Sequence, residues 1–158
     1  MRPEVTVYIT NYNYGKYISK AIKSCLEQSF KNIEIIIIDD GSTDNSRKII
    51  NKFVSKHSNV YVIFKKNKGL IASCNTALRV ARGKYILRLD ADDWLDRNAI
   101  EIMHLKIEKN KDVELLFSDY YEVDENGKVL HTIRRHDFRR VKLYDQPAHG
   151  ACTLFKRK

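Results

Sequence analysis

The sequence predicts an α/β fold with a mainly parallel sheet flanked by helices, and three observations lead to it. Strand-like and helix-like segments alternate from residue 5 to residue 89. Residues 33–38 are almost entirely β-branched, a pattern typical of a strand buried on both faces of a parallel sheet. The length of 158 residues, of which 43% are hydrophobic, suits one domain with a real core.

The elements follow in a regular order. Four strands are expected, at residues 5–9, 33–38, 60–64 and 85–89. Apolar residues recurring at helical spacing predict three helices between them, at residues 18–26, 49–54 and 70–81. Asp44 or Ser42 is available to cap the start of the second helix, and Gly83 to close the third. This strand–helix alternation predicts parallel strands joined by right-handed crossovers.

The pattern changes in the last third of the chain. A further helix is expected at residues 100–107 and a further strand at residues 113–118. Residues 120–133 contain Asp124-Glu125-Asn126-Gly127-Lys128, a strong turn signal that predicts a β-hairpin. Residues 134–147 are expected to be irregular and mobile. No internal repeat or interdomain linker is evident.

Charge is concentrated near the C-terminus. The formal net charge is +9, and residues 134–158 hold eight lysines and arginines against two aspartates. Such a segment attracts nucleic acid, anionic lipid or a phosphorylated substrate, or is simply a solvated surface, and composition does not decide among these. No apolar run has the roughly 20 residues that a membrane span needs, and no signal peptide is evident. The three cysteines show no zinc spacing, which predicts a reducing, cytoplasmic location.

Polar residues collect where three of the predicted strands end. The first strand runs into Thr10-Asn11-Tyr12-Asn13, the second into Asp39-Asp40-Gly41-Ser42, and the fourth into Asp90-Ala91-Asp92-Asp93. In open α/β sheets, ligands bind beyond the carboxyl ends of the strands. We therefore expect these segments to converge on one acidic rim that binds a ligand.

The aspartates of this rim suggest two kinds of contact. Carboxylates packed closely repel one another unless a cation offsets them, and their hard oxygen atoms suit Mg²⁺ or Mn²⁺, which can bridge to a diphosphate. The alternative is a helix-start cluster, but the position beside two other polar strand ends favours the metal. Asp39 and Asp40 can accept hydrogen bonds from a nucleoside or serve the loop, and both interpretations remain open. The absence of G-x-G-x-x-G and G-x-x-x-x-G-K-[ST] disfavours dinucleotide, methyl-donor and P-loop NTPase sites.

Taken together, the motifs resemble those of family 2 glycosyltransferases of the GT-A fold, a Rossmann-like sandwich. The resemblance covers residues 5–97 closely, in order and spacing. The matching motifs are Tyr12-Asn13, Ser24 to Gln28 as Ser-x-x-x-Gln, Asp39-Asp40-Gly41-Ser42 with Thr43-Asp44, Asn67-Lys68-Gly69, Asn75, Gly83-Lys84-Tyr85-Ile86 and Asp90-Ala91-Asp92-Asp93. The resemblance implies a nucleotide-sugar-binding half at residues 1–97 and a partial acceptor-side half at residues 98–158, within one domain.

The resemblance also implies roles for single residues. Thr10 and Asp40 should line the nucleoside pocket, with Asp40 facing the base, while Asp90 should approach the ribose. Asp92 should hold the Mg²⁺ or Mn²⁺ ion that bridges the donor diphosphate. The remaining positions expected to contact the substrate are Asn11, Tyr12, Asn13, Asp39, Asn67, Gly69 and Asn75. The implied reaction is transfer of a sugar, with inversion, from a UDP-sugar to an acceptor hydroxyl on an unidentified glycan, lipid-linked or protein acceptor.

Two departures from the family pattern matter. Cys74 stands where many relatives carry an arginine before the helical Asn75, so a phosphate or loop contact is expected to be missing. Relatives carry their catalytic carboxylate after a strand that resembles residues 149–157, and this chain ends at Lys158. No catalytic base is therefore assigned, although His149 and Asp145 lie nearby in sequence. We expect the 158 residues to bind a nucleotide sugar but to transfer it poorly.

Three other functions compete with this interpretation. A non-catalytic nucleotide-sugar-binding module would share the rim but lack turnover. A sugar-nucleotide nucleotidylyltransferase would need a glycine-rich basic loop after the first strand, which residues 11–16 match poorly. A nucleic-acid-binding protein ranks last, because an acidic rim repels phosphates unless a metal is bound. The expected location is cytoplasmic, with contact to the inner face of a membrane through the basic C-terminal segment.

Overall fold

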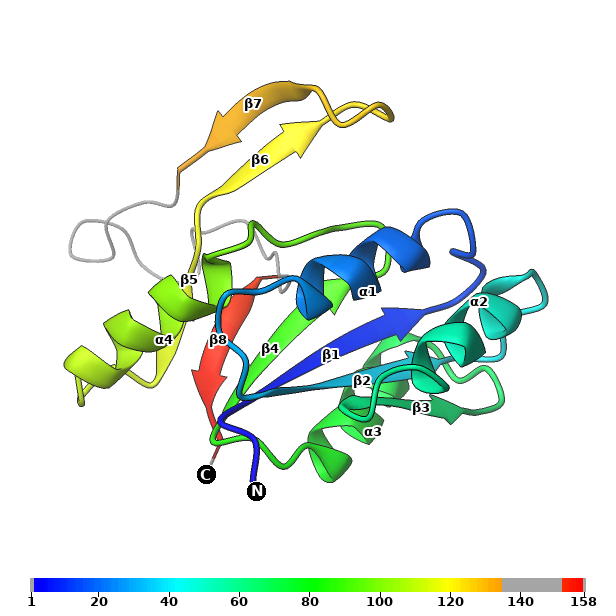
Figure 1. Cartoon of the computed structure of the whole chain (residues 1–158), viewed down its shortest axis with the longest axis horizontal. Coiled ribbons are helices and arrows are strands. Elements are labelled where there is room, and N and C mark those ends of the chain that lie inside the picture. The colour runs from blue at the N-terminus through cyan, green and yellow to red at the C-terminus, as the bar shows by residue number, and fades with distance from the viewer. Residues whose placement is uncertain (1, 135–151, 158) are drawn as a thin grey trace.

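A computed structural model describes residues 2–134 and 152–157 of the chain. Its main sheet has six strands in the order β3-β2-β1-β4-β8-β5, and a separate two-stranded sheet pairs β6 with β7 (Figure 1). The main strands are β1 (Val5–Asn11), β2 (Ile33–Asp39), β3 (Val60–Phe64), β4 (Tyr85–Asp90), β5 (Leu115–Phe117) and β8 (Thr153–Lys156). The helices are α1 (Ile18–Leu26), α2 (Ser46–Val54), α3 (Leu70–Val80) and α4 (Ala99–Lys109).

The parallel sheet expected from the sequence is confirmed. Strands β1 to β4 pair in parallel, whereas β8 lies antiparallel between β4 and β5. Helices α1, α2 and α4 pack against one face of the sheet and share its larger apolar core, while α3 covers the other face (Figure 1). The result is a three-layer arrangement in which the crossover helices bury both faces of the central strands.

Strand β2 is buried along its whole length, as its β-branched sequence predicts. Its two polar residues are Glu34 and Asp39, and Glu34, within the apolar run, is 2% exposed. Its carboxylate accepts hydrogen bonds from Thr6 Oγ1 at 2.6 Å, from Arg82 N at 2.7 Å and from Arg82 Nε at 2.7 Å. A buried carboxylate is tolerated only when it is paired and hydrogen-bonded, and these donors meet that requirement.

Two predicted helix ends are corrected. Helix α2 begins at Ser46 with Asn45 at the N-cap position, although Asp44 Oδ1 still accepts a hydrogen bond from Ser46 N at 2.9 Å. Ser42 does not cap this helix, because its hydroxyl is used by the loop after β1.

Gly83 is not the C-cap of α3, which ends at Val80 with Ala81 at the C-cap position. The backbone N–H of Gly83 instead donates to Thr6 Oγ1 at 2.8 Å, across to β1. A Cβ at position 83 would lie 2.5 Å from Thr6 N. Glycine is needed here for close approach of two backbones rather than for a helix end.

The predicted hairpin is confirmed as β6 (Tyr120–Val123) and β7 (Val129–Ile133). In its turn, Gly127 has φ 85°, and Asp124 Oδ1 accepts hydrogen bonds from Asn126 N and Lys128 N, both at 2.9 Å. The strand expected at residues 113–118 is shorter, because Val113 N bonds back to Asn110 O in the turn after α4. Of the segment expected to be irregular, residues 135–147 lie outside the described residues.

Candidate functional site

The carboxyl ends of β2, β1 and β4 lie side by side in the sheet. Asn11 is in register with Asp39 of β2, and Thr10 is in register with Asp90 of β4. The three polar strand ends therefore form one rim, as the order of the elements predicts. The side chains of this rim differ in how many protein partners they have.

Asp39 and Asn11 are hydrogen-bonded to each other inside the rim. Asp39 is fully buried, and its carboxylate accepts hydrogen bonds from Asn11 Nδ2 at 2.8 Å and from Ser42 N at 3.0 Å. Asn11 Nδ2 also donates to Ser42 Oγ at 3.0 Å. Both side chains are buried and hold the loops after β1 and β2 together.

Asn13, in the loop after β1, also bonds to the loop after β2. It adopts a positive φ of 59°, a conformation that asparagine tolerates better than most residues. Its Oδ1 accepts a hydrogen bond from Thr43 N at 2.8 Å, and its own N–H donates to Ser42 Oγ at 2.9 Å. Tyr12, between these anchored residues, is 47% exposed and faces solvent.

Asp40 connects the end of β2 to the segment between β3 and α3. Lys65 Nζ forms an ion pair with Asp40 Oδ1, and the backbone N–H groups of Lys68 and Gly69 donate to the carboxylate at 3.0 and 2.8 Å. Burial disfavours the charged form of Asp40, but these donors outweigh it and hold the pKa of the carboxyl below its ordinary value. Asp40 is therefore ionised at neutral pH.

Lys65 is a rim residue that none of the sequence motifs indicated. It directly follows the third predicted strand, so the rule that ligands bind beyond strand ends could have found it. The neighbouring segment includes Asn67, whose backbone N would lie 2.9 Å from a Cβ at position 41, and Gly69, with φ 83°. The exposed Asn75 lies six residues after Gly69, on α3.

The aspartates after β4 are held unequally. Asp90 Oδ1 accepts hydrogen bonds from Arg88 Nε at 3.0 Å and Arg88 Nη2 at 2.7 Å, because alternate residues of a strand share a face. Asp93 N donates to Asp90 O at 3.1 Å, which closes a tight turn. Asp92 is exposed, and within the described residues its carboxylate has no hydrogen bond or ion pair.

The loop that follows these aspartates is held by α1. Leu95 N donates to Ser24 Oγ at 3.1 Å, and Ile100 N donates to Gln28 Oε1 at 3.0 Å. Gln28 Nε2 also donates to Asp96 O at 2.7 Å. The Ser24 and Gln28 pattern therefore has a structural function, because it positions the loop leading away from Asp92.

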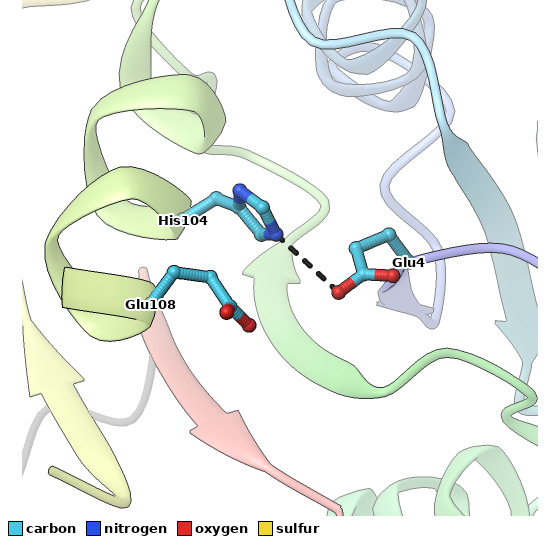
Figure 2. A group of neighbouring side chains, drawn as sticks. All are labelled: Glu4, His104 and Glu108. Carbon is cyan, nitrogen blue, oxygen red and sulfur yellow. Dashed lines mark hydrogen bonds and ion pairs between the residues drawn. The ribbon is translucent and has the colours of Figure 1, made fainter. Parts of the chain in front are cut away.

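A second acidic group lies at the opposite, amino-terminal ends of β1 and β4. Glu4, His104 and Glu108 form the one group of three potential metal ligands found in residues 2–134 and 152–157 (Figure 2). Lys84 Nζ donates to Glu108 and lies 3.5 Å from Glu4 Oε1, while Tyr85 Oη also donates to Glu108. Lys84 supplies the positive charge, so this is an ion-pair cluster that joins α4 to the sheet.

The part of the chain expected to hold a catalytic base is only partly described. His149 and Asp145 lie outside the described residues. The strand expected near them is present as β8, next to β4. Over the described ranges, no helix combines the length and the apolar character needed to cross a membrane.

A mainly parallel sheet flanked by helices defines an α/β protein, and the acidic rim at its strand ends is the candidate ligand site. The family model described as Glycosyl transferase family 2 matches residues 6–158, and the chain belongs to this family. The match supports the interpretation as a glycosyltransferase over the nucleotidylyltransferase and nucleic-acid alternatives.

Relatives and solved structures agree with this assignment. Glycosyltransferase GlyG of Streptococcus pneumoniae is 37% identical over 136 residues, which are 85% of this chain and 45% of GlyG. The chondroitin synthase of Escherichia coli is 36% identical over 128 residues, covering 81% of this chain and 19% of the synthase. The chain thus spans less than half the length of either relative.

Two solved structures show the same GT-A fold. S. aureus TarS 1–349 in complex with UDP has a TM-score of 0.79 at 21% identity, covering 98% of this chain and 47% of that one. The mannosyltransferase PcManGT of Pyrobaculum calidifontis, in complex with GDP-Man and Mn²⁺, has a TM-score of 0.64 at 25% identity. The match covers 74% of this chain and 35% of the mannosyltransferase chain.

Proposed function

We propose that this chain binds a nucleoside-diphosphate sugar at the carboxyl ends of β1, β2 and β4, for transfer of the sugar to an acceptor hydroxyl. The observation that carries the proposal is the contrast among the rim aspartates. Asp39, Asp40 and Asp90 are held by protein donors, whereas Asp92 has no partner in the described residues. Asp92, an exposed carboxylate without a protein partner among the described residues, is therefore suited to bind a cation that accompanies the nucleotide sugar.

The chemistry of Asp92 fits a divalent cation. A single carboxylate leaves most coordination positions open, which is how Mg²⁺ and Mn²⁺ are usually held together with substrate phosphates. The Mn²⁺ and GDP-Man named with PcManGT support this choice. When bound, such an ion stabilises the negative charge that develops on the departing diphosphate.

Thr10, Asp40 and Asp90 are proposed to hold the nucleoside. A carboxylate offers about four acceptor positions, and protein donors take three of those on Asp40, which leaves capacity for one N–H of a base. Asp90, whose carboxylate accepts two hydrogen bonds from Arg88, is proposed to accept a further hydrogen bond from the ribose. Uridine is the proposed base, and the UDP and UDP-GlcNAc bound by TarS, a protein of the same fold, are compatible with it.

The proposed reaction is a single displacement. The acceptor oxygen forms a bond to the anomeric carbon as the bond from that carbon to the diphosphate oxygen breaks, so the configuration inverts. The acceptor proton passes to a general base within hydrogen-bond reach.

Calorimetric titration of UDP, with Mn²⁺ or with EDTA, tests the proposal. UDP should bind more tightly in Mn²⁺ to the unchanged chain, and Asp92→Asn should remove that difference while circular dichroism stays unchanged. Asp112→Asn, an exposed aspartate in the turn after α4, is the matched control and should keep the metal dependence. Equal UDP affinity in Mn²⁺ and EDTA for the unchanged chain would refute the role of Asp92. Turnover of a UDP-sugar separates an enzyme from a non-catalytic binding module.

A further inference from the structure

A groove runs along α1 beside the loop that follows Asp92. Its volume is about 640 Å³, which lies within the range of about 300–1,000 Å³ common for small-molecule sites. The charged and aromatic residues that line this α1 groove are Lys20, Lys23, Glu27, Lys31, Trp94 and Arg97. Leu26 and Leu95, which also belong to the larger apolar core, line the groove as well, whereas none of the residues proposed to hold the nucleoside does.

The charge of the α1 groove is strongly positive. Four cationic side chains face one carboxylate, that of Glu27. Lys20 Nζ lies 3.0 Å from the centre of the Trp94 ring, a cation–π contact that fixes the indole. Lys23, Lys31 and Arg97 form no ion pair with any carboxylate of the described residues. Unneutralised cations in a concave site attract anions from solution.

The position of the groove relates it to the proposed donor site. Trp94 lies two residues after Asp92, so one end of the groove adjoins the proposed metal ligand. The hairpin turn reaches the same end, because a Cβ at Gly127 would lie 3.6 Å from Lys20 Nζ and 3.9 Å from Trp94 Cζ2. From there the groove leads away along α1 to Lys31.

A second, smaller groove continues this basic surface between α1 and α2. It has a volume of about 410 Å³, shares Lys23 with the α1 groove and adds Lys52 and Lys56. The two grooves share Lys23 and together present six cationic side chains, those of Lys20, Lys23, Lys31, Lys52, Lys56 and Arg97. A concave basic surface suits an extended anionic chain better than the flat surface of a bilayer does.

We infer that the α1 groove binds an anionic glycan, the sugar chain of the acceptor, through its carboxylate or phosphate groups. The inference rests on the proposed function, because it places the acceptor end of that chain beside Asp92. Lys23, Lys31 and Arg97 donate charge-assisted hydrogen bonds to the anionic groups. The hairpin turn at Gly127 lies beside the groove at the end next to Asp92.

Tryptophan fluorescence can report binding to the groove, because Trp94 is the single tryptophan of the chain. Titration with hexagalacturonate, a carboxylate-bearing hexasaccharide, should change Trp94 fluorescence, whereas neutral maltohexaose should not. A phosphorylated maltohexaose then tells whether phosphate serves as well as carboxylate. Lys31→Glu combined with Arg97→Glu should weaken hexagalacturonate binding about tenfold, because two positive charges of the groove become negative.

The matched control is Lys106→Glu combined with Lys109→Glu, two exposed lysines on α4 outside the groove. This variant should keep hexagalacturonate affinity within about twofold, since its charges lie elsewhere. Equal weakening by both double variants would overturn the inference, as would equally tight binding of duplex DNA. Binding to phosphatidylglycerol vesicles without binding to hexagalacturonate would also overturn it, in favour of a membrane surface. UDP titration of the same samples separates the two proposals: normal UDP binding with no glycan binding overturns only the groove.

Discussion

At the scale of single residues, the aspartates of the rim look equivalent in sequence and are not equivalent in the fold. Asp39 is buried and holds two loops, Asp40 is tied to Lys65, and Asp90 is oriented by Arg88. Only Asp92 of these four is exposed without a partner among the described residues. The roles proposed for them follow from this difference in partners rather than from their shared chemistry.

Asp40 is predicted to serve the fold and the nucleoside at once. Asp40→Ala removes the acceptor of three donors, and the lost bonds to a charged group should destabilise the chain by about 1.5–3 kcal/mol. UDP affinity, measured by calorimetry, should fall about tenfold or more.

Lys65→Met is the matched variant for this test, since it removes the ion pair and leaves the Asp40 carboxylate in place. It should lower the free energy of unfolding, measured by urea denaturation, yet retain most of the UDP affinity. If both variants lose UDP affinity equally, Asp40 acts only by holding the segment before α3.

Arg88 supplies a guanidinium near the position where many relatives carry an arginine on α3. Position 74, where many relatives carry arginine, is Cys74 here. Arg88 comes from β4 to the face of the sheet covered by α3, where Cys74 also lies, and its guanidinium pairs with Asp90. A guanidinium is thus present on this face, although it comes from a strand rather than from α3.

At the scale of elements, the approach of β1 to the start of β4 depends on Gly83. Its φ is ordinary, but a Cβ there would meet Thr6 N at 2.5 Å and Tyr85 O at 2.7 Å. Those backbone atoms belong to paired strands and have little room to move. Position 83 therefore requires glycine because there is no space for a Cβ, and not because of its backbone conformation.

Gly83→Ala is predicted to destabilise the chain by more than 2 kcal/mol, because overpacking against fixed backbone forces the strands apart. Gly127→Ala is the comparison: it has a positive φ of 85° but no atom closer than 3.6 Å to the added Cβ. Its cost should be about 1–2 kcal/mol, the cost of a left-handed residue. Urea denaturation measures both, and a larger loss at Gly127 would contradict this account of Gly83.

At the scale of the whole molecule, the cluster around Glu108 ties α4 to the sheet and makes stability depend on pH. Hydrogen bonds from Lys111, Lys84 and Tyr85 hold the pKa of Glu108 well below its ordinary value. A carboxyl whose pKa is lower in the folded state stabilises the fold above its unfolded pKa of about 4.3. That stabilisation is lost as the pH falls towards the folded pKa.

We therefore predict that the free energy of unfolding falls as the pH is lowered below about 4.5. Glu108→Gln should make this fall shallower, since Gln does not titrate, while also lowering stability at pH 7. Glu125→Gln, an exposed position in the hairpin turn, should leave the pH profile unchanged. Chemical denaturation between pH 2 and pH 7 checks this. An identical acid dependence in the unchanged chain and Glu108→Gln would show that other groups cause it.

The amino-acid sequence by itself determined the order of the first four strands and three helices, the two-sided burial of β2, the hairpin and the polar strand ends. Each of these depends on the spacing of apolar and turn-forming residues within about ten neighbours, and that spacing is a local property. The family resemblance rested on the same local motifs, which the family match then confirmed.

Only the tertiary structure decided which charges meet. Asp40 pairs with Lys65 and Glu4 approaches His104, and the Ser24 hydroxyl holds the loop after Asp92. The place of β8, antiparallel between β4 and β5, and the α1 groove were likewise set by packing. The physical reason is that a side chain's partner depends on which distant segments the sheet brings together, and one sequence contains many charges that could pair with each carboxylate.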